Sequence, residues 1–139
     1  MPITAFDHYT LRCADLDATW AFYRDALGLR VEPREVASGL RAAIVYMQGA
    51  WLAHIFQATP EQDAVFGRMQ PRDAEMEQWR TGRVHHIALW ATGLSELKAR
   101  LAQHGVVARE RAQGDYYRVV VNDPDGVELE INFPIAESR

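Results

Sequence analysis

The sequence predicts an α+β fold built from two βαβββ modules, whose curved mixed sheets surround a cavity. The main observation is internal repetition, because a strand-helix-strand-strand-strand pattern occurs twice with an offset of about 77 residues. Each copy also opens on a histidine followed by apolar residues, in "FDHYTLRC" (residues 6–13) and "RVHHIALW" (residues 83–90). A chain of 139 residues is long enough for one domain, residues 1–139, that contains both modules.

The first module covers residues 5–58 and begins with a strand at residues 6–13. A helix follows, because apolar side chains recur on one face at Leu16, Trp20, Tyr23 and Leu27. Asp15 precedes this helix as a predicted N-cap. Gly28 follows it, where a left-handed residue commonly ends a helix. The rest of the module is expected to be extended, in the strands 29–34, 40–47 and 51–58, with a turn at 48–50 between the last two.

The second module covers residues 83–134 and repeats this order. Its helix, within residues 92–105, has a stripe of Leu94, Leu97 and Leu101 and ends at Gly105. The turn residues Asp-Pro-Asp-Gly at 123–126 join its last two strands. The strands of this module are expected at residues 84–91, 106–111, 115–122 and 127–133. Between the modules, residues 59–82 are polar and charged, and we interpret them as a linker with one short surface helix.

Composition excludes several classes of protein. The 15 basic and 19 acidic residues are interspersed and give a net charge of −4, which argues against nucleic acid as a partner. No apolar run approaches the ~20 residues of a membrane span, and the first residues do not resemble a secretion signal. Cys13 is the single cysteine, so no internal disulfide can form and a cytoplasmic location is expected.

Superposing the modules aligns the residues that could bind a metal. His8 falls on His86, and His54 falls on Glu130. Two histidines and one carboxylate are a known facial ligand set for a divalent transition metal. A single histidine on a strand is usually structural, but four ligand types at equivalent positions favour a site for one divalent ion. The residues suit Fe, Ni, Zn and Mn alike and do not identify the metal.

Strand periodicity extends the site to neighbouring side chains, because alternate residues share a face of a strand. Arg12 shares the face of His8, where it could hold a substrate carboxylate or a developing oxyanion. Phe56 shares the face of His54 and Trp90 that of His86, so these two rings could form an aromatic wall. The parity of Tyr116 and Tyr117 stays open, and of the two we assign Tyr117 to substrate binding.

The chain resembles the vicinal oxygen chelate superfamily, also called the glyoxalase/bleomycin-resistance/dioxygenase superfamily. The motifs that carry the resemblance are "DHYTLRCADLDATWAFYRDALGL", "HHIALWATGLSELKARLAQHG" and "NDPDGVELEINF". The resemblance implies paired βαβββ modules around a metal, with His8, His86 and Glu130 at matching ligand positions and His54 at the fourth. It also implies that the metal binds vicinal oxygens of a substrate and stabilises an enolate, alkoxide or catecholate.

The sequence departs from glyoxalase I within this superfamily. That enzyme has a glutamate where His54 stands and an asparagine where Ala58 stands, although Arg12 matches its arginine near glutathione. Strict glyoxalase I activity is therefore not expected. Two reaction classes stay open: isomerase or lyase chemistry at an α-oxygenated carbonyl, and extradiol cleavage of a catechol by two histidines and a glutamate.

The function expected from the sequence is that of a small metalloenzyme with a small-molecule substrate. Glu130 or His54 would leave the metal and act as general acid or base. The alternative is a metal-independent binding protein, like the bleomycin-resistance members that hold a drug in an aromatic groove. We also expect a homodimer, because each βαβββ module exposes a concave sheet that needs a partner.

Overall fold

The computed structural model describes residues 7–35, 41–57, 59 and 86–138. These residues fall into two compact units: residues 7–24, 29–35, 41–57 and 59 form the first, and residues 25–28 and 86–138 form the second. The predicted linker, with its surface helix, lies outside the described residues except for Thr59.

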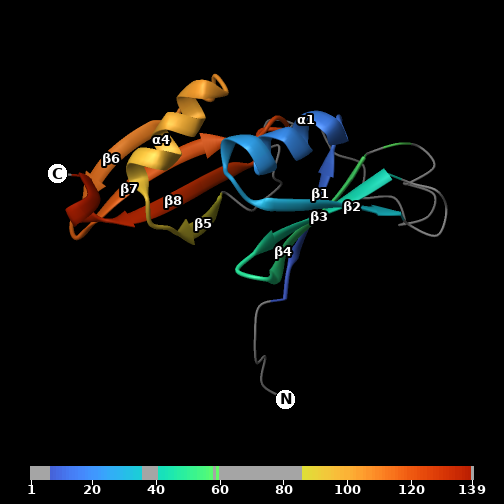
Figure 1. Ribbon diagram of the computed structural model, residues 1–139, viewed down its shortest axis with the longest axis horizontal. Coiled ribbons are helices and arrows are strands. Elements are labelled where there is room, and N and C mark those ends of the chain that lie inside the picture. The colour runs from blue at the N-terminus through green and yellow to red at the C-terminus, as the bar shows by residue number, and fades with distance from the viewer. Residues whose placement is uncertain (1–6, 36–40, 58, 60–85, 139) are drawn as a thin grey trace, which may run out of the picture. The chain divides into compact units, whose positions relative to one another are not determined.

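The first unit contains the predicted βαβββ order (Figure 1). Its sheet has the strand order β1-β4-β3-β2, in which β1 and β4 are parallel and the other neighbours are antiparallel. Pro33 is tolerated within a strand because β2 lies at the edge of this sheet. The elements are β1 (Tyr9–Cys13), α1 (Leu16–Ala21), the π-helix η1 (Phe22–Ala26), β2 (Arg30–Glu35), β3 (Arg41–Met47) and β4 (Ala50–Gln57). The last two residues of η1 are grouped with the second unit.

The second unit repeats the topology strand for strand. Its sheet has the order β5-β8-β7-β6, again with the first and last strands of the unit paired in parallel. The predicted α+β fold of two βαβββ modules with mixed sheets is therefore confirmed. The elements are β5 (Ile87–Trp90), α4 (Leu94–Gln103), β6 (Arg109–Gln113), β7 (Tyr116–Asn122), β8 (Glu128–Pro134) and the 3-10 helix η2 (Ile135–Ser138).

The first helix begins as predicted and ends differently. The carboxylate of Asp15 accepts hydrogen bonds from the backbone nitrogens of Asp17 and Ala18, at 2.9 and 3.1 Å. The single α-helix expected up to Leu27 instead becomes the π-helix η1 after Ala21. Its wider turn buries neighbouring residues in pairs, namely Phe22 with Tyr23 and Ala26 with Leu27.

The helix of the second unit covers one face of its sheet (Figure 1). Leu94, Leu97 and Leu101 are all buried, as the apolar stripe predicts. The cap of this helix is long-range, because a carboxylate oxygen of Glu137 in η2 accepts hydrogen bonds from the backbone nitrogens of Gly93 and Leu94, at 2.8 and 2.9 Å. These bonds satisfy amide groups that the helix itself cannot pair.

Both predicted turns fix the register of the strands around them. Gln48 and Gly49 join β3 to β4 with positive φ angles of 51° and 84°, which is the geometry of a tight hairpin. Between β7 and β8, the buried Asp123 carboxylate accepts hydrogen bonds from the backbone nitrogens of Asp125 and Val127. This turn pairs Asn122 with Glu128, and the pairing sets every later partner in the hairpin.

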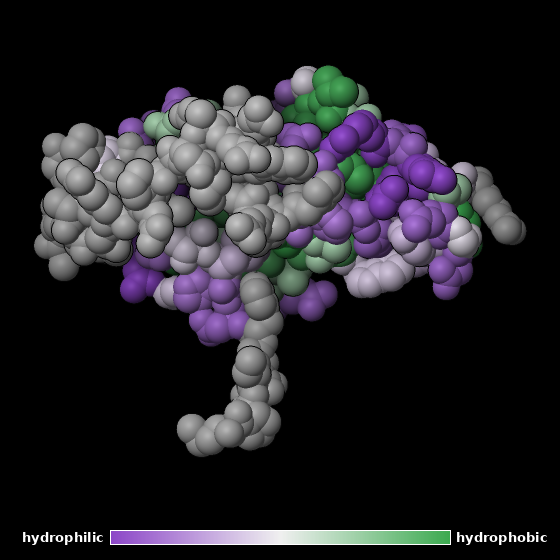
Figure 2. Space-filling view, turned by 180° about the vertical axis from the view of Figure 1, so that it is seen from behind, coloured by the Kyte–Doolittle hydropathy of each residue, from purple (hydrophilic) through white to green (hydrophobic). Residues whose placement is uncertain are grey.

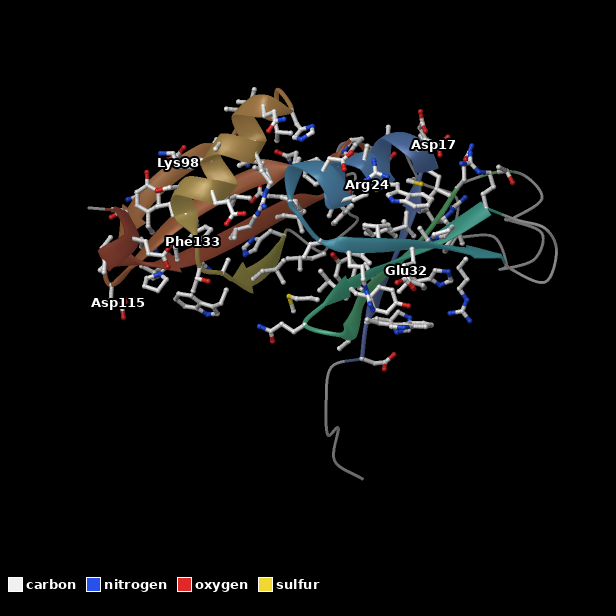
Figure 3. All side chains as sticks on the ribbon, in the orientation of Figure 1. Asp17, Arg24, Glu32, Lys98, Asp115 and Phe133 are labelled. Carbon is white, nitrogen blue, oxygen red and sulfur yellow. The ribbon has the colours of Figure 1, made fainter. Side chains whose placement is uncertain are left out.

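Each sheet has a helix-facing side and a second side that we call the site face. In β8, Leu129, Ile131 and Phe133 belong to the helix-facing side, and Glu128, Glu130 and Asn132 to the site face, as strand periodicity predicts. Phe133 is fully buried (Figure 3). The site face is thus where each unit can present polar side chains from its inner strands.

No helix among the described residues is long and apolar enough to span a membrane.

Candidate functional site

The first unit brings His8 and His54 to its site face. Thr10 of β1 pairs with His54 of β4, and His8 lies two residues before Thr10 on the same side of the chain. Both imidazoles also lie near the ring of Trp51, whose centroid is 5.4 Å from that of His8 and 6.4 Å from that of His54. His8 comes just before β1, so the strand is shorter at this end than predicted. The two histidines therefore form the first half of the predicted ligand set.

The His54 imidazole is half-buried between aromatic rings. Its ring centroid lies 6.1 Å from that of Phe56 and 6.4 Å from that of Trp51. Burial lowers the pKa of His54 below its ordinary value of 6.5, and the nearby charges of Arg34 and His8 lower it further. The side chain is consequently neutral at neutral pH, which leaves a lone pair on one ring nitrogen.

His54 also carries a buried nitrogen that needs a partner. Its Nε2 atom is inaccessible to solvent and has no hydrogen-bond partner among the residues that the structure describes. Leaving a buried polar atom unsatisfied costs about 1–3 kcal/mol, so such atoms usually mark a bound ligand, ion or water. This observation fits a metal-ligating histidine.

His8 is oriented by its neighbour in the sequence. The Nδ1 atom of His8 forms a hydrogen bond with the carboxylate of Asp7, and its ring packs edge-on against Trp51 with centroids 5.4 Å apart. In a neutral imidazole whose Nδ1–H donates a hydrogen bond to a carboxylate, the lone pair is on Nε2. A carboxylate behind the histidine is the usual outer partner of a metal-binding imidazole.

The second unit places His86 and Glu130 in the same register. Ala88 of β5 pairs with Glu130 of β8, and His86 lies two residues before Ala88. The His86 Nε2 atom is 3.9 Å from a carboxylate oxygen of Glu130. The position of Glu130 relative to β5 is therefore the position of His54 relative to β1, as the superposition of the modules predicts.

Two further side chains hold the Glu130 carboxylate. Asn132 donates to one oxygen and Arg118 to the other, each at 3.1 Å. Burial raises the pKa of Glu130, but the hydrogen bonds from Asn132 and Arg118 and the positive charges nearby outweigh it, so the pKa lies below its usual range. Glu130 is therefore an ionised carboxylate in a fixed orientation at neutral pH.

The predicted substrate-binding residues have different outcomes. Arg12 pairs with Phe56 in the register of β1 and β4, and both belong to the site face of the first unit. Trp90 belongs to the site face of the second unit, where it is 69% exposed and its ring lies 5.9 Å from that of Tyr116. These placements agree with strand periodicity, whereas the roles in substrate binding stay predictions.

Tyr117 is on the other side of its sheet. It pairs with Phe133 in the register of β7 and β8, and its hydroxyl donates to the Glu110 carboxylate at 2.7 Å. This hydrogen bond, more than burial, raises the pKa of Tyr117, while Lys98 of α4 binds the same carboxylate at 2.7 Å. The tyrosine that shares the face of Glu130 is Tyr116, and the role of Tyr117 in substrate binding stays a prediction.

Arg118 and Asn132 were not singled out from the sequence as partners of Glu130. The signal was present, because the turn at 123–126 pairs Asn122 with Glu128, and counting back along the hairpin pairs Arg118 with Asn132. Both side chains then share the face of Glu130. The sequence could not show that the Arg118 side chain extends toward Glu130.

The residues present fit a divalent metal. Two imidazoles in the first unit, with an imidazole and an ionised carboxylate in the second, are nitrogen and oxygen donors suited to a transition metal. Within the described part of the chain the four ligands lie as one pair in each unit, and no group of three or more histidine, cysteine, aspartate or glutamate side chains gathers at one point. Each unit thus carries two of the four predicted ligands, and their joint role stays a prediction.

The fold and these residues define a class: a two-module βαβββ protein with imidazole and carboxylate side chains on the site faces of both sheets. The protein-family model of the Glyoxalase/Bleomycin resistance protein/Dioxygenase superfamily matches residues 5–131 of the chain. The chain belongs to this superfamily. No curated protein sequence matches the chain.

Solved structures share the fold over nearly the whole length. The chain is similar to lactoylglutathione lyase from Agrobacterium tumefaciens, with 24% identity, a TM-score of 0.62 and 96% of each chain covered. A glyoxalase/bleomycin resistance protein/dioxygenase domain from Frankia sp. EAN1pec is 18% identical, with a TM-score of 0.69 and coverage of 96% of this chain and 93% of that chain.

A third similar structure contains a metal. It is a point mutant of the fosfomycin resistance protein FosX from Listeria monocytogenes, complexed with Mn(II) and 1S,2S-dihydroxypropylphosphonic acid. The identity is 20% and the TM-score 0.63, with 94% of this chain and 90% of that chain covered. At these identities the three structures establish the shared fold.

Proposed function

We propose that the protein is a metal-dependent enzyme whose small substrate chelates a divalent transition metal through two adjacent oxygens. The protein ligands in this proposal are His8 and His54 from the first unit and His86 and Glu130 from the second. The observation that carries the proposal is the unsatisfied Nε2 atom of His54, at the position where the second unit has Glu130. Membership of a superfamily with a Mn(II)-bound neighbour supports it.

The metal is expected to be Fe, Ni, Zn or Mn, and when bound it would polarise the substrate oxygens as a Lewis acid. The two candidate acid-base groups then divide their roles. Glu130 is ionised, is held by two hydrogen bonds and has a lowered pKa, so it serves as a ligand and is a weak base. His54 is neutral at neutral pH, and it would have to leave the metal before its freed Nε2 atom could accept a proton from the substrate.

Other side chains of the site faces would position the substrate. Arg12, the register partner of Phe56, would supply a positive charge for a carboxylate or a developing oxyanion. Phe56 and Trp90 offer ring faces that exclude water from the substrate. Besides Tyr117, we propose Tyr116 as the hydroxyl that shares the face of Glu130.

Metal binding is the first test. Protein purified without chelator should contain a divalent metal by elemental analysis, and isothermal titration should give one site. The variants His8→Ala and His86→Ala should each weaken it by more than the ~10–100-fold that follows loss of an outer partner. His104→Ala, at the exposed end of α4, is the matched control. Wild type that stays metal-free with Zn, Ni, Mn or anaerobic Fe would refute the proposal.

Activity assays then separate the two reaction classes. The metal-loaded protein is assayed for isomerase or lyase activity on α-oxygenated carbonyls, including the methylglyoxal–glutathione hemithioacetal, and for oxygen uptake with catechols. Turnover that depends on His54 in one assay and is absent in the other assigns the class. We also propose a homodimer, and light scattering that shows a monomer at tens of micromolar would contradict that part.

The alternative function is metal-independent binding of an aromatic small molecule. The observation that favours it is Trp90, which is largely exposed and lies edge-on against Tyr116 on the site face. Aromatic ligands are titrated into chelator-treated protein while tryptophan fluorescence is followed. Tight binding that requires no metal and is lost in Trp90→Ala would favour this alternative over the enzyme.

A further inference from the structure

The site face of the second unit contains a pocket with a volume of ≈ 350 Å³. Figure 2 shows that hydrophilic residues gather over this unit, in the right half of that view. Every residue of the edge strand β6 is exposed. The residues of this pocket that matter here are His86 and Glu130 together with Arg109, Arg111, Arg118 and Glu128.

Two arginines face each other across adjacent strands in this pocket. Arg111 of β6 is the direct register partner of Arg118 of β7. Such neighbours have Cβ atoms about 4.5–5.5 Å apart, and like charges at these positions repel each other. An arrangement of this kind is unfavourable unless negative charge lies close to both.

The three glutamates that line the pocket are each bound to a side chain other than Arg111, and Glu110 among them binds Lys98 and Tyr117. Glu128 pairs with Arg109 at 2.6 Å, and Glu130 pairs with Arg118 at 3.1 Å. Among the residues that the structure describes, Arg111 forms no ion pair or hydrogen bond, although it lines the pocket. Its guanidinium therefore presents a full set of donors to the space beside Arg118.

We propose that Arg111 and Arg118 form a subsite for an oxyanion group of a small ligand, either a carboxylate or a phosphate or phosphonate. The planar guanidinium can donate two parallel hydrogen bonds to such a group, and this geometry makes arginine the common residue for its recognition. The bound anion would also supply the negative charge that the opposed arginines lack.

Arg118 connects this subsite to Glu130, because it donates to the Glu130 carboxylate and faces Arg111. If the proposed function holds, this subsite restricts the substrate of the enzyme to a small anion. The charged group of such a substrate would bind Arg111 and Arg118, and Arg118 separates this subsite from the Glu130 carboxylate.

The test titrates methylphosphonate and, separately, acetate into the chelator-treated full chain and follows binding by calorimetry. Saturable binding is expected for at least one of them, and neutral acetamide should not bind. Arg111→Gln should weaken binding at least ten-fold, with Arg111→Lys intermediate. The control Arg41→Gln removes the same charge from an arginine that pairs with Asp17 in the first unit, and its affinity should equal that of the wild type.

Two results would overturn the inference: absence of saturable binding of both anions, or equal affinity in wild type and in Arg111→Gln. Circular dichroism checks that Arg111→Gln is folded, and Arg111→Lys, which keeps the charge, gives a second measurement of the same dependence. Tighter binding of methylphosphonate indicates a site for a tetrahedral phosphate or phosphonate group, and equal or tighter binding of acetate indicates a site for a carboxylate. Because metal is absent, failure here is distinct from failure of the metal-content test above.

Discussion

The two units share a backbone plan and differ in the chemistry of their site faces. In the first unit, the row of partners across the sheet runs from Glu32 through Ile44 to His54. In the second unit, the equivalent row runs from Arg109 through Val120 to Glu130. The first unit thus has an acidic residue on its edge strand and a histidine on its inner strand. The second unit has a basic residue on its edge strand and a glutamate on its inner strand. Glu32 projects from β2 on the side away from α1 (Figure 3).

The next row shows the same divergence. Arg34 and Arg111 occupy equivalent positions on the edge strands β2 and β6. The guanidinium of Arg34 lies 4.9 Å from the centre of the Trp51 ring, which is a favourable cation–π contact. Arg111 instead faces another arginine. Repetition therefore preserves register while each unit adjusts the protonation and charge of its own half of the site.

The largest expected effect concerns the helix-facing sides of the two sheets, which should contribute similarly to the stability of their units. Ile55 of β4 and Ile131 of β8 are equivalent and buried. Replacing either by alanine should lower the free energy of unfolding by about 2–5 kcal/mol, because each leaves a cavity in its core. Urea denaturation measures both losses. A much smaller loss for one of them would show that the units do not share a core design.

A smaller loss of stability is expected for a substitution on the site face of the second unit. Arg118→Met removes a hydrogen bond to the ionised Glu130 and should lower stability by about 1–3 kcal/mol at pH 7. The lowered pKa of Glu130 gives stability that is complete above its ordinary value of 4.5 and is lost as the pH falls through the folded-state value. The difference between variant and wild type should therefore shrink below about pH 4.5.

Urea denaturation at pH 7, 5 and 3.5 checks this dependence. A difference that stays constant over this range would mean that Arg118 stabilises the unit by packing and not through Glu130.

The helix caps give the next prediction. Asp15 caps α1 from the adjacent residue, whereas Glu137 caps α4 from η2. Asp15→Ala and Glu137→Ala should each cost about 0.5–2 kcal/mol, since each leaves helix amide groups without a partner. The conservative variants Asp15→Asn and Glu137→Gln keep an acceptor and should recover most of the loss in thermal unfolding. No recovery would argue against capping.

The smallest predicted effect is the pH response of His54. Because its pKa is lowered on folding, it contributes stability that is complete above about pH 6.5 and is lost as the pH falls through the folded-state value. His54→Asn should remove this loss, which amounts to about 1 kcal/mol or less. Comparing denaturation at pH 7.5 and 5.5 measures it. An unchanged pH response in the variant would place the titrating group elsewhere.

Much of the fold followed from the sequence because its signals are local. Period-2 alternation placed Glu130 and Ile131 on opposite faces, and the turn residues at 123–126 marked the hairpin. The repeat offset aligned His54 with Glu130 before any strand pairing was known. These inferences need only neighbouring residues and a count along the chain.

The features that were missed depend on distant residues or on exact register. The cap from Glu137 lies 44 residues from Gly93, and no local pattern indicates it. The choice between Tyr116 and Tyr117 required the hairpin register, in which a shift of one residue exchanges the faces. The π-helix at Phe22–Ala26 depends on packing, and helix propensity does not predict it.

The parallel pairing of the first and last strands has a consequence for folding order. In each unit the last three strands form an antiparallel meander of short-range contacts, while β1 and β5 must wait for the final strand to be in place. His8 and His86 sit just ahead of these late-docking strands. Local detachment of β1 or β5 would displace His8 or His86 while the three-stranded meander stays folded. A bound ion would therefore stabilise the attachment of the strand that pairs last in each unit.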